Sequence, residues 1–257
     1  MFIRPSSPAS SFYERASRTL SREGSGEKLR ILMKKIVVIS LGGSLVVPGD
    51  IDVLFLKKFK AFIYKNLKKW RFIIVVGGGR TNSRYNKAAK SFGVKDPDSF
   101  DWIGIYTTWL NAQLVRTLFL DNAESYILAN PYKKIKFTKP ILLAGGHVPG
   151  SSTDLSAAVL AKTHKAHELI NLSDIKYVYD KDPSKYRSAK PLKKLSWKDY
   201  RKIIGSKWTP RLNSPFDPTA AKYCQKNKLK VVVAAGRDSK NLQNILNGKK
   251  LKGTVIE

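Results

Sequence analysis

Three glycine-rich turns constrain this chain most, and each turn follows a short apolar run. The turns are Leu41-Gly42-Gly43-Ser44, Gly77-Gly78-Gly79-Arg80 and the segment from Gly145 to Asp154. The apolar runs before them cover residues 36–39, 72–76 and 141–144, and a segment able to form a helix follows each turn. A strand, a glycine turn and a helix in this order aim backbone N–H groups and a helix N-terminus at an anion. Three such turns predict a site that holds several phosphates at once, as a phosphoryl-transfer enzyme must.

The rest of the pattern alternates apolar runs with amphipathic segments. Expected strands cover residues 35–41, 71–76, 125–129, 140–144, 168–172, 230–235 and 253–256. Expected helices cover residues 51–70, 80–92, 101–120, 154–164, 196–204, 218–227 and 241–246. Strands that alternate with helices form a mainly parallel sheet with helices on both faces. The sequence therefore predicts an α/β fold, a three-layer αβα sandwich around a mainly parallel central sheet.

The charge of the chain is unusual, with 48 Lys and Arg residues against 19 Asp and Glu residues, a formal net charge of +29. Such a charge fits nucleic acid, an anionic membrane surface, or a lysine-rich surface around a site for phosphorylated ligands. We favour the third interpretation, because the lysines are dispersed and no RNA-binding aromatic motif accompanies them. No apolar stretch reaches the ~20 residues that span a bilayer. Cys224 is the only cysteine, which excludes an intrachain disulfide and fits a reducing compartment, so we expect a cytoplasmic protein.

Residues 1–33 differ in composition from the rest of the chain. They are rich in Ser, Arg and Gly and show no convincing periodicity, so we expect a disordered extension. Glu14, Glu23 and Glu27 argue against a transit peptide, and the apolar core of a signal peptide is missing. Met33 directly precedes the first expected strand, which makes it a candidate for the natural start.

The first two turns have both a structural and a functional interpretation. Gly42 and Gly43 let the backbone approach a phosphate, and Ser44 adds a hydroxyl, but a tight strand-to-helix turn also needs glycine. Neither turn is a P-loop or a dinucleotide-binding fingerprint. Three adjacent glycines in the second turn exceed what one turn needs, which favours phosphate binding there. Arg80 and Arg84, one helical turn apart, suit phosphate recognition unless both point to solvent.

The third turn carries the most chemistry. Between Gly145 and Thr153 it offers three glycines, a proline, His147 and three hydroxyls, which can bind a nucleotide phosphate or a base edge. His147 at such a position more often makes a local hydrogen bond than takes part in catalysis. Asp154 either is an acidic residue favoured in a first helical turn or orients groups near the transferred phosphoryl group.

From residue 35 to the C-terminus, the order and spacing of these motifs resemble the amino acid kinase superfamily and, within it, the archaeal-type UMP kinases. The matching segments are Ser40 to Ser44, Val75 to Arg80, Arg84-Tyr85, Asp101 to Ile105, Asn111-Ala112, Gly145-Gly146, Pro149-Gly150, Ser152 to Asp154, Ala157-Ala158, Tyr179, Asp182-Pro183, Asp217-Pro218, Ala220-Ala221 and Gly253-Thr254. The resemblance implies a single kinase domain over residues 34–257. Residues 34–165 would form the UMP lobe and residues 166–257 the ATP lobe.

The resemblance also implies roles for individual residues. Contacts to ATP are expected from Gly42, Gly43, Ser44, Gly79, Ser83, Ser173, Tyr179 and Asp182. Contacts to UMP are expected from Gly78, Asp101, His147, Val148, Pro149, Gly150, Ser151, Ser152 and Thr153. Arg84 and Asp154 are the expected catalytic residues, and the expected cofactors are ATP and Mg²⁺, with no dedicated metal site. Asp101 also has a structural interpretation, as the N-cap of the helix that follows it. The family is further expected to form homohexamers.

Departures from the family pattern leave rival functions open. Many kinases of the superfamily carry a lysine just before the Leu-Gly-Gly turn, where this chain has Ser40, so another cation must neutralise the transferred group. Arg84 is the first candidate, and Lys176 is a second that is more simply explained as a surface lysine. One rival is another small-molecule kinase of the superfamily. The other is a non-catalytic basic regulator that binds nucleotides or nucleic acid.

Overall fold

The computed structural model describes residues 31–183, 185–204 and 215–257. The chain divides into two units, Met1–Lys34 and Lys35–Glu257. Residues 1–30 of the extension that we predict to be disordered lie outside the described residues. The helices and strands named below belong to the second unit.

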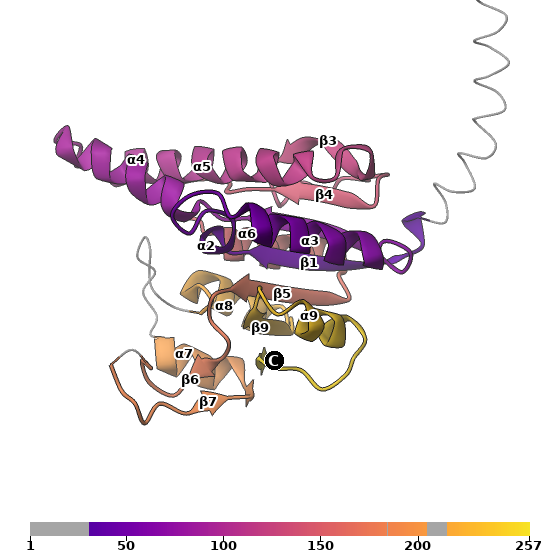
Figure 1. The fold of residues 1–257 in the computed structure, drawn as a ribbon. Coiled ribbons are helices and arrows are strands. Elements are labelled where there is room, and N and C mark those ends of the chain that lie inside the picture. Colours follow the sequence, from indigo (N-terminus) through magenta and orange to yellow (C-terminus); the bar gives the residue numbers. More distant parts are fainter. Residues whose placement is uncertain (1–30, 184, 205–214) are drawn as a thin grey trace, which may run out of the picture. The chain divides into compact units, whose positions relative to one another are not determined.

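An eight-stranded sheet forms the centre of the second unit, with strand order β3-β4-β2-β1-β5-β9-β10-β8 (Figure 1). Its strands are β1 (Lys35–Leu41), β2 (Trp70–Val76), β3 (Ala123–Leu128), β4 (Ile141–Ala144), β5 (Glu168–Ser173), β8 (Lys194–Leu195), β9 (Val231–Ala235) and β10 (Thr254–Ile256). The strands from β3 to β9 in this order pair in parallel, and only the pair of β9 with β10 is antiparallel. The mainly parallel sheet confirms the predicted fold class.

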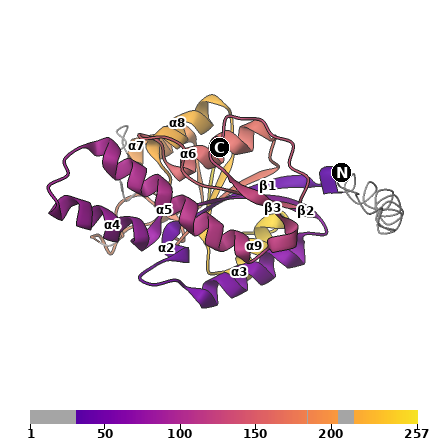
Figure 2. The same ribbon diagram turned by 90° about the horizontal axis from the view of Figure 1, so that it is seen from above.

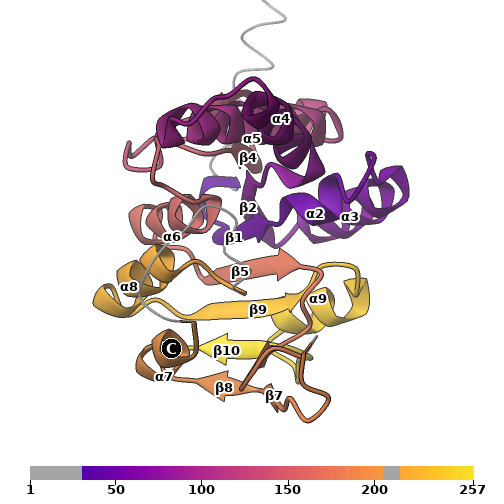
Figure 3. The ribbon, with the colours of Figure 1, turned by 90° about the vertical axis from the view of Figure 1, so that its left-hand side faces the viewer.

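Helices cover both faces of this sheet. They are α2 (Gly43–Val46), α3 (Val53–Asn66), α4 (Gly79–Ser91), α5 (Pro97–Thr117), α6 (Thr153–Thr163), α7 (Trp197–Ile204), α8 (Pro218–Lys226) and α9 (Ser239–Leu246), with a 3₁₀ turn at Leu120–Asn122. Figure 3 shows α3 and α9 on one face of the sheet and α6 and α8 on the other. Figure 2 shows α4 and α5 side by side. Within the described residues, none of these helices has both the length and the apolar character needed to cross a bilayer.

The alternation of side chains along the strands produces the three layers. Val37 and Ile39 of β1 are fully buried in a core cluster with residues of α3, α5 and α9. Val38, between them, is buried in a second cluster with residues of α6 and α8. Because neighbouring residues of a strand point to opposite faces, a strand buried on both faces must be apolar throughout. The run Ile36 to Leu41, interrupted only by Ser40, meets this requirement.

The structure differs from the expected elements mainly at helix ends. The helix expected over residues 101–120 begins earlier, at Pro97, because Asp96 caps it by accepting from the backbone N–H of Ser99 at 2.9 Å. Helix α3 begins at Val53 rather than at residue 51, since Asp52 is its N-cap. The short elements α2, β8 and the two-stranded sheet of β6 (Val178–Tyr179) and β7 (Pro191–Leu192) were not expected.

Candidate active site

The three glycine turns meet at one edge of the sheet. β1, β2 and β4 are parallel and in register, with Leu41 opposite Val76 and Val75 opposite Ala144, so their carboxyl ends lie at the same edge. β1 also pairs with β5 on its other side. The connection from β1 to β2 contains α3, and the connection from β4 to β5 contains α6, on the opposite face. The chain order therefore reverses at β1, and ligands of open α/β sheets bind in the crevice at such a point.

The first and second glycine turns pack backbone against backbone. A Cβ atom on Gly43 would lie 2.1 Å from the backbone N of Gly79 and 2.7 Å from the carbonyl carbon of Gly77. Gly79 has φ of +59°, in the left-handed region where glycine is favoured, and a Cβ there would lie 2.4 Å from the Gly43 carbonyl oxygen. The inference that the glycine triplet exceeds structural needs is therefore wrong, because the contact between the two turns explains it sterically.

Helix α5 holds the second and third turns in place through polar side chains. The Asn111 amide donates to the carbonyl oxygens of Gly77 and Gly78, at 2.9 Å each. The backbone N–H of Gly146 donates to the Thr108 hydroxyl at 2.7 Å, and the Trp109 indole N–H donates to the Gly146 carbonyl at 2.8 Å. Asn111 and Thr108 are buried, so these bonds fix the direction of the peptide groups in both turns.

The third turn is also joined to α5 by a carboxylate. The backbone N–H of Gly150, which has φ of +74°, donates to the Asp101 carboxylate at 2.7 Å. Asp101 lies inside α5 and does not cap it, so the structural interpretation of Asp101 as an N-cap is wrong. Next to this contact, Nδ1 of His147 lies 3.0 Å from the Ala129 carbonyl, which is the local hydrogen bond that we considered for this residue. Val148 is exposed, and Ser152 caps α6 by accepting from the Leu155 N–H.

Asp154 lies at the centre of a polar cluster just below this edge. It accepts from the Ser40 hydroxyl at 2.8 Å, from the Asn171 amide at 3.1 Å and from the Asp217 backbone N–H at 3.1 Å. Burial raises the pKa of Asp154 to about 6, despite the lowering effect of these hydrogen bonds. Burial also raises the pKa of Asp217, whose carboxylate caps α8. Ser40 therefore gives Asp154 a hydrogen bond but no neutralising charge.

Arg84 lies apart from this cluster. Its guanidinium is 3.3 Å from the Asp50 carboxylate, and both side chains are largely exposed. Ser83, the residue before it on α4, is partly buried, while Ser44 is an exposed residue of α2. An exposed ion pair of this kind contributes little to stability, so Arg84 can exchange Asp50 for another anion at small cost.

The residues expected to hold ATP divide between two places. Gly42 caps α2, and its N–H donates to the Leu172 carbonyl at 2.7 Å, which brings the first turn beside Ser173 at the end of β5. Tyr179 lies in the small β6–β7 sheet, where its ring meets that of Tyr177 edge-on, and Asp182 lies in the turn that follows. Ser173, Tyr179 and Asp182 therefore lie on one stretch of chain that begins at the end of β5.

Several residues of the site were missed as functional candidates from the sequence. Asn171 and Asp217 bind Asp154, and Thr108 and Trp109 hold the third turn. Asn171 is signalled only by its polarity within the apolar run of β5, and Asp217 by its place before Pro218 in a segment that matches the family. The described residues contain no group of three His, Cys, Asp or Glu side chains that could hold a metal ion.

Comparison with known proteins identifies the family. The profile of the amino acid kinase family matches residues 35–235. The chain belongs to the amino acid kinase family. It is 36% identical to the uridylate kinase of Thermoplasma volcanium, over 88% of this chain and 99% of that protein, and 32% identical to the uridylate kinase of Thermococcus kodakarensis, over 86% and 99%. The crystal structure of uridylate kinase from Archaeoglobus fulgidus is similar, with a TM-score of 0.75 and 30% identity over 86% of this chain and 99% of that one. These similarities confirm the resemblance drawn from the motifs.

The contact between the glycine turns predicts that this amino acid kinase does not tolerate a methyl group at Gly43. We expect Gly43→Ala to lower the free energy of unfolding by at least about 2 kcal/mol, because both partners of the clash are backbone atoms. Urea unfolding measures the change. Gly49→Ala is the matched control, since a Cβ there would meet nothing within 4 Å. Equal losses in the two variants would contradict the steric argument.

The buried carboxyl of Asp154 predicts a pH-dependent stability. Its pKa is about 6 in the folded protein against 3.8 as the ordinary value, so its contribution to stability is complete below pH 3.8 and is lost as the pH rises through about 6. Asp154→Asn removes this titration. Between about pH 4 and pH 7 we expect the wild type to lose on the order of 2 kcal/mol relative to this variant in urea unfolding. Asp98→Asn, at an exposed carboxylate of α5, is the control. Parallel pH curves for wild type and Asp154→Asn would refute the assignment.

Proposed function

We propose that this protein is a UMP kinase, which transfers the γ-phosphoryl group of ATP to UMP and forms UDP and ADP for pyrimidine nucleotide biosynthesis. The observation that carries the proposal is the meeting of three glycine turns at one sheet edge, beside the point where the strand order reverses. The uridylate kinases named above align with this chain over almost their whole length, which supports the same reaction here.

The reaction needs positioning and electrostatic stabilisation more than acid–base chemistry. An oxygen of the UMP phosphate attacks the γ-phosphorus of ATP, and the bond from that phosphorus to the oxygen shared with the β-phosphate breaks as ADP leaves. A phosphate monoester is already an anionic nucleophile, so no general base is required. Helix α5 holds the second and third glycine turns in place. The backbone N–H groups of the turns that do not already donate within the protein would stabilise the charge on the phosphate oxygens.

Each nucleotide has its own half of the site in this proposal. The ATP phosphates lie against Gly42, Gly43, Ser44 and Gly79, with the adenosine near Ser173, Tyr179 and Asp182. UMP lies against Gly78, Asp101 and the segment from His147 to Thr153. The hydrogen bond of Asp101 with Gly150 supports this arrangement, because it joins the two UMP elements directly.

The hydrogen-bond partners of Asp154 include no cationic side chain. Ser40 is neutral, so we propose that Arg84 leaves Asp50 and binds the transferred group when both nucleotides are present. Mg²⁺ is usually held through substrate phosphates and one or two carboxylates, which fits a site without a three-residue metal cluster among the described residues. Asp154 would be its carboxylate ligand, and the ion would offset phosphate charge.

We also propose a homo-oligomer, a hexamer as expected of the family, in the cytoplasm. Helix α5 supports the oligomer, because it carries Trp102, Tyr106 and Leu110 on one face, 41%, 61% and 60% exposed. Side chains four residues apart lie on the same face of a helix. Large apolar side chains gathered on one exposed face are typical of protein interfaces.

The proposed reaction predicts ADP release from Mg-ATP that depends on UMP. Asp101→Asn should raise the KM for UMP by about tenfold or more, because the neutral amide oxygen accepts from the Gly150 N–H more weakly than the charged carboxylate does. Arg84→Ala should lower kcat with little effect on the unfolding free energy, as its ion pair is exposed. Asp98→Asn, one helical turn before Asp101 on α5, is the matched control and should keep wild-type kinetics.

The same assay separates the rival functions. Turnover with acetylglutamate or another acceptor but not with UMP would point to a different small-molecule kinase of the family. Binding of UMP and ATP without turnover of any acceptor would contradict the enzyme proposal and favour a nucleotide-binding regulator.

The exposed face of α5 predicts that a charge there dissociates the oligomer. We expect Tyr106→Glu and Leu110→Glu to lower the mass measured by light scattering. An unpaired carboxylate buried in the interface would raise the free energy of the oligomer by more than the lost side-chain contact contributed. Phe92→Glu, at the exposed end of α4, is the control for adding a charge at an apolar surface residue. An unchanged mass for both α5 variants would exclude this face from the interface.

A further inference from the structure

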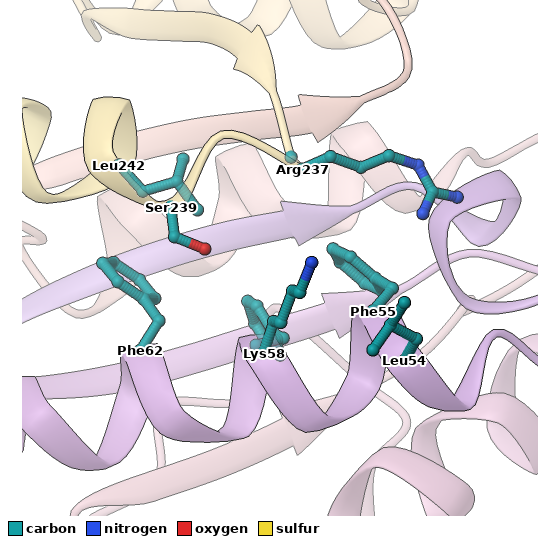
Figure 4. Close-up of a pocket in the computed structure, with 9 residues that line it drawn as sticks. Leu54, Phe55, Lys58, Phe62, Arg237, Ser239 and Leu242 are labelled. Carbon is teal, nitrogen blue, oxygen red and sulfur yellow. The ribbon is translucent and has the colours of Figure 1, made fainter.

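A hollow lies between α3 and α9, outside the residues assigned to the proposed reaction. It contains about 430 Å³ of empty space, including space open to solvent, and its lining comes from one side of α3 and from the segment between β9 and α9 (Figure 4).

The floor of the hollow is apolar. Phe55, Phe59 and Phe62 of α3 and Leu242 of α9 line it and are otherwise buried in the core, while Leu54 at its mouth is 65% exposed. Rings and aliphatic groups in this arrangement offer dispersion contacts and the release of water to an apolar body.

Cationic and polar groups stand above this floor. Lys58 extends from α3 and Ser239 from the start of α9, and Arg237 completes the lining on the β9 side (Figure 4). Arg237 is already paired with Asp52 at 2.7 Å and with Asp174 at 3.5 Å. Lys58 makes no ion pair with any described residue. Its ammonium is therefore the cation at the hollow that can receive an external anion.

The surroundings of the hollow carry the same sign of charge. The segments 52–62 and 236–242, which include the lining residues, carry four lysines. All four are exposed, and none pairs with an acidic side chain of the described part of the chain: Lys57, Lys58, Lys60 and Lys240. Asp52 and Asp238 are the acidic residues of these segments, and both are used as helix caps. The positive potential raises the local concentration of anions at the mouth of the hollow.

We propose that this hollow binds a small, soluble, amphipathic anion, in which a carboxylate or phosphate is attached to an apolar or aromatic body. The body lies on the phenylalanine floor and the anionic group on Lys58, beside Ser239. Charge complementarity selects the anion and the apolar floor selects the body, so neither part alone binds well.

A nucleotide fits this hollow poorly. The edges of a nucleobase carry donors and acceptors that lose water on burial and must find partners. Ser239 is the only neutral polar side chain in the lining, and the floor offers carbon atoms alone. The hollow therefore favours a ligand whose buried part has no hydrogen-bonding groups.

A ligand in the hollow can affect the residues proposed to bind ATP, because Arg237 connects the hollow to them. The residue joins Asp52, the N-cap of α3, to Asp174, which follows Ser173, and the N–H of the neighbouring Gly236 donates to the Ser173 carbonyl at 2.9 Å. An effect on the KM for ATP rests on the proposed function, whereas binding itself does not.

Binding is tested with phenyl phosphate as the probe, on the full chain labelled at leucine methyl groups and saturated with UMP and ADP. Under these conditions the nucleotide site is filled, and the test does not require catalysis. We expect the methyl signals of Leu54 and Leu242 to shift with millimolar affinity. Inorganic phosphate and benzyl alcohol, which supply the anion and the ring separately, should each bind at least about fivefold more weakly.

A pair of charge reversals makes the test specific. Lys58→Glu should weaken phenyl phosphate binding at least about fivefold, because it reverses the charge at the hollow itself. Lys57→Glu makes the same change on the next residue of α3, outside the lining, and should weaken binding less than about twofold. Both lysines are exposed, so neither variant threatens folding.

Other outcomes overturn the proposal. Unmoved methyl signals would show that the hollow does not bind the probe, and equal effects of Lys57→Glu and Lys58→Glu would reduce it to diffuse attraction by the surface. Equal binding of inorganic phosphate would remove the role of the apolar floor. Sedimentation with phosphatidylglycerol vesicles that Lys58→Glu abolishes, and that displaces phenyl phosphate, would assign the hollow to a lipid headgroup instead.

Discussion

The contact between two glycine turns is the constraint on which the candidate site depends. Gly43 lies so close to Gly77 and Gly79 that any side chain there would strike backbone. The contact brings the ends of β1 and β2 to a common point, which is where we propose that the phosphates bind. Asn111 then fixes the peptide groups of the second turn from α5. Backbone donors held in this way need little reorganisation when phosphate charge develops, which is the main source of catalysis expected for phosphoryl transfer.

The Asp154 cluster shows how a neutral residue changes the electrostatics of the same edge. With Ser40, Asn171 and the Asp217 N–H as partners, the carboxylate receives three hydrogen bonds but no opposite charge. Burial then dominates and raises the pKa of Asp154. A lysine in place of Ser40 would instead favour the ionised form. In the proposed reaction, a cationic side chain for the transferred group would come from outside this cluster, and we propose the loosely paired Arg84 for this role.

Local patterns in the sequence predicted the fold well, because its strands are short apolar runs bounded by glycine. The first expected strand, residues 35–41, coincides with β1, and the central helices and strands differ from expectation by a few residues at their ends. Non-local contacts could not be predicted in this way. The spacing of Gly43 and Gly79 in the sequence does not indicate that one turn packs on the other. The residues near Asp101 do not indicate that its carboxylate contacts Gly150. Helix α5 begins before the predicted residue 101, because the Asp96-Pro97 cap precedes the apolar periodicity.

Helix α5 connects the proposed oligomer to the proposed chemistry. Thr108, Trp109 and Asn111 hold two glycine turns, while Trp102, Tyr106 and Leu110 of the same helix face outward. The ring of Tyr106 meets that of Trp109 edge-on at 5.6 Å, so the outward face touches a residue that anchors the third turn. A partner packed on Tyr106 would restrict the Trp109 ring and, through its bond to the Gly146 carbonyl, the loop proposed to hold UMP. Assembly and acceptor binding would then be coupled by direct contacts within one helix, since each would limit the same side-chain motions.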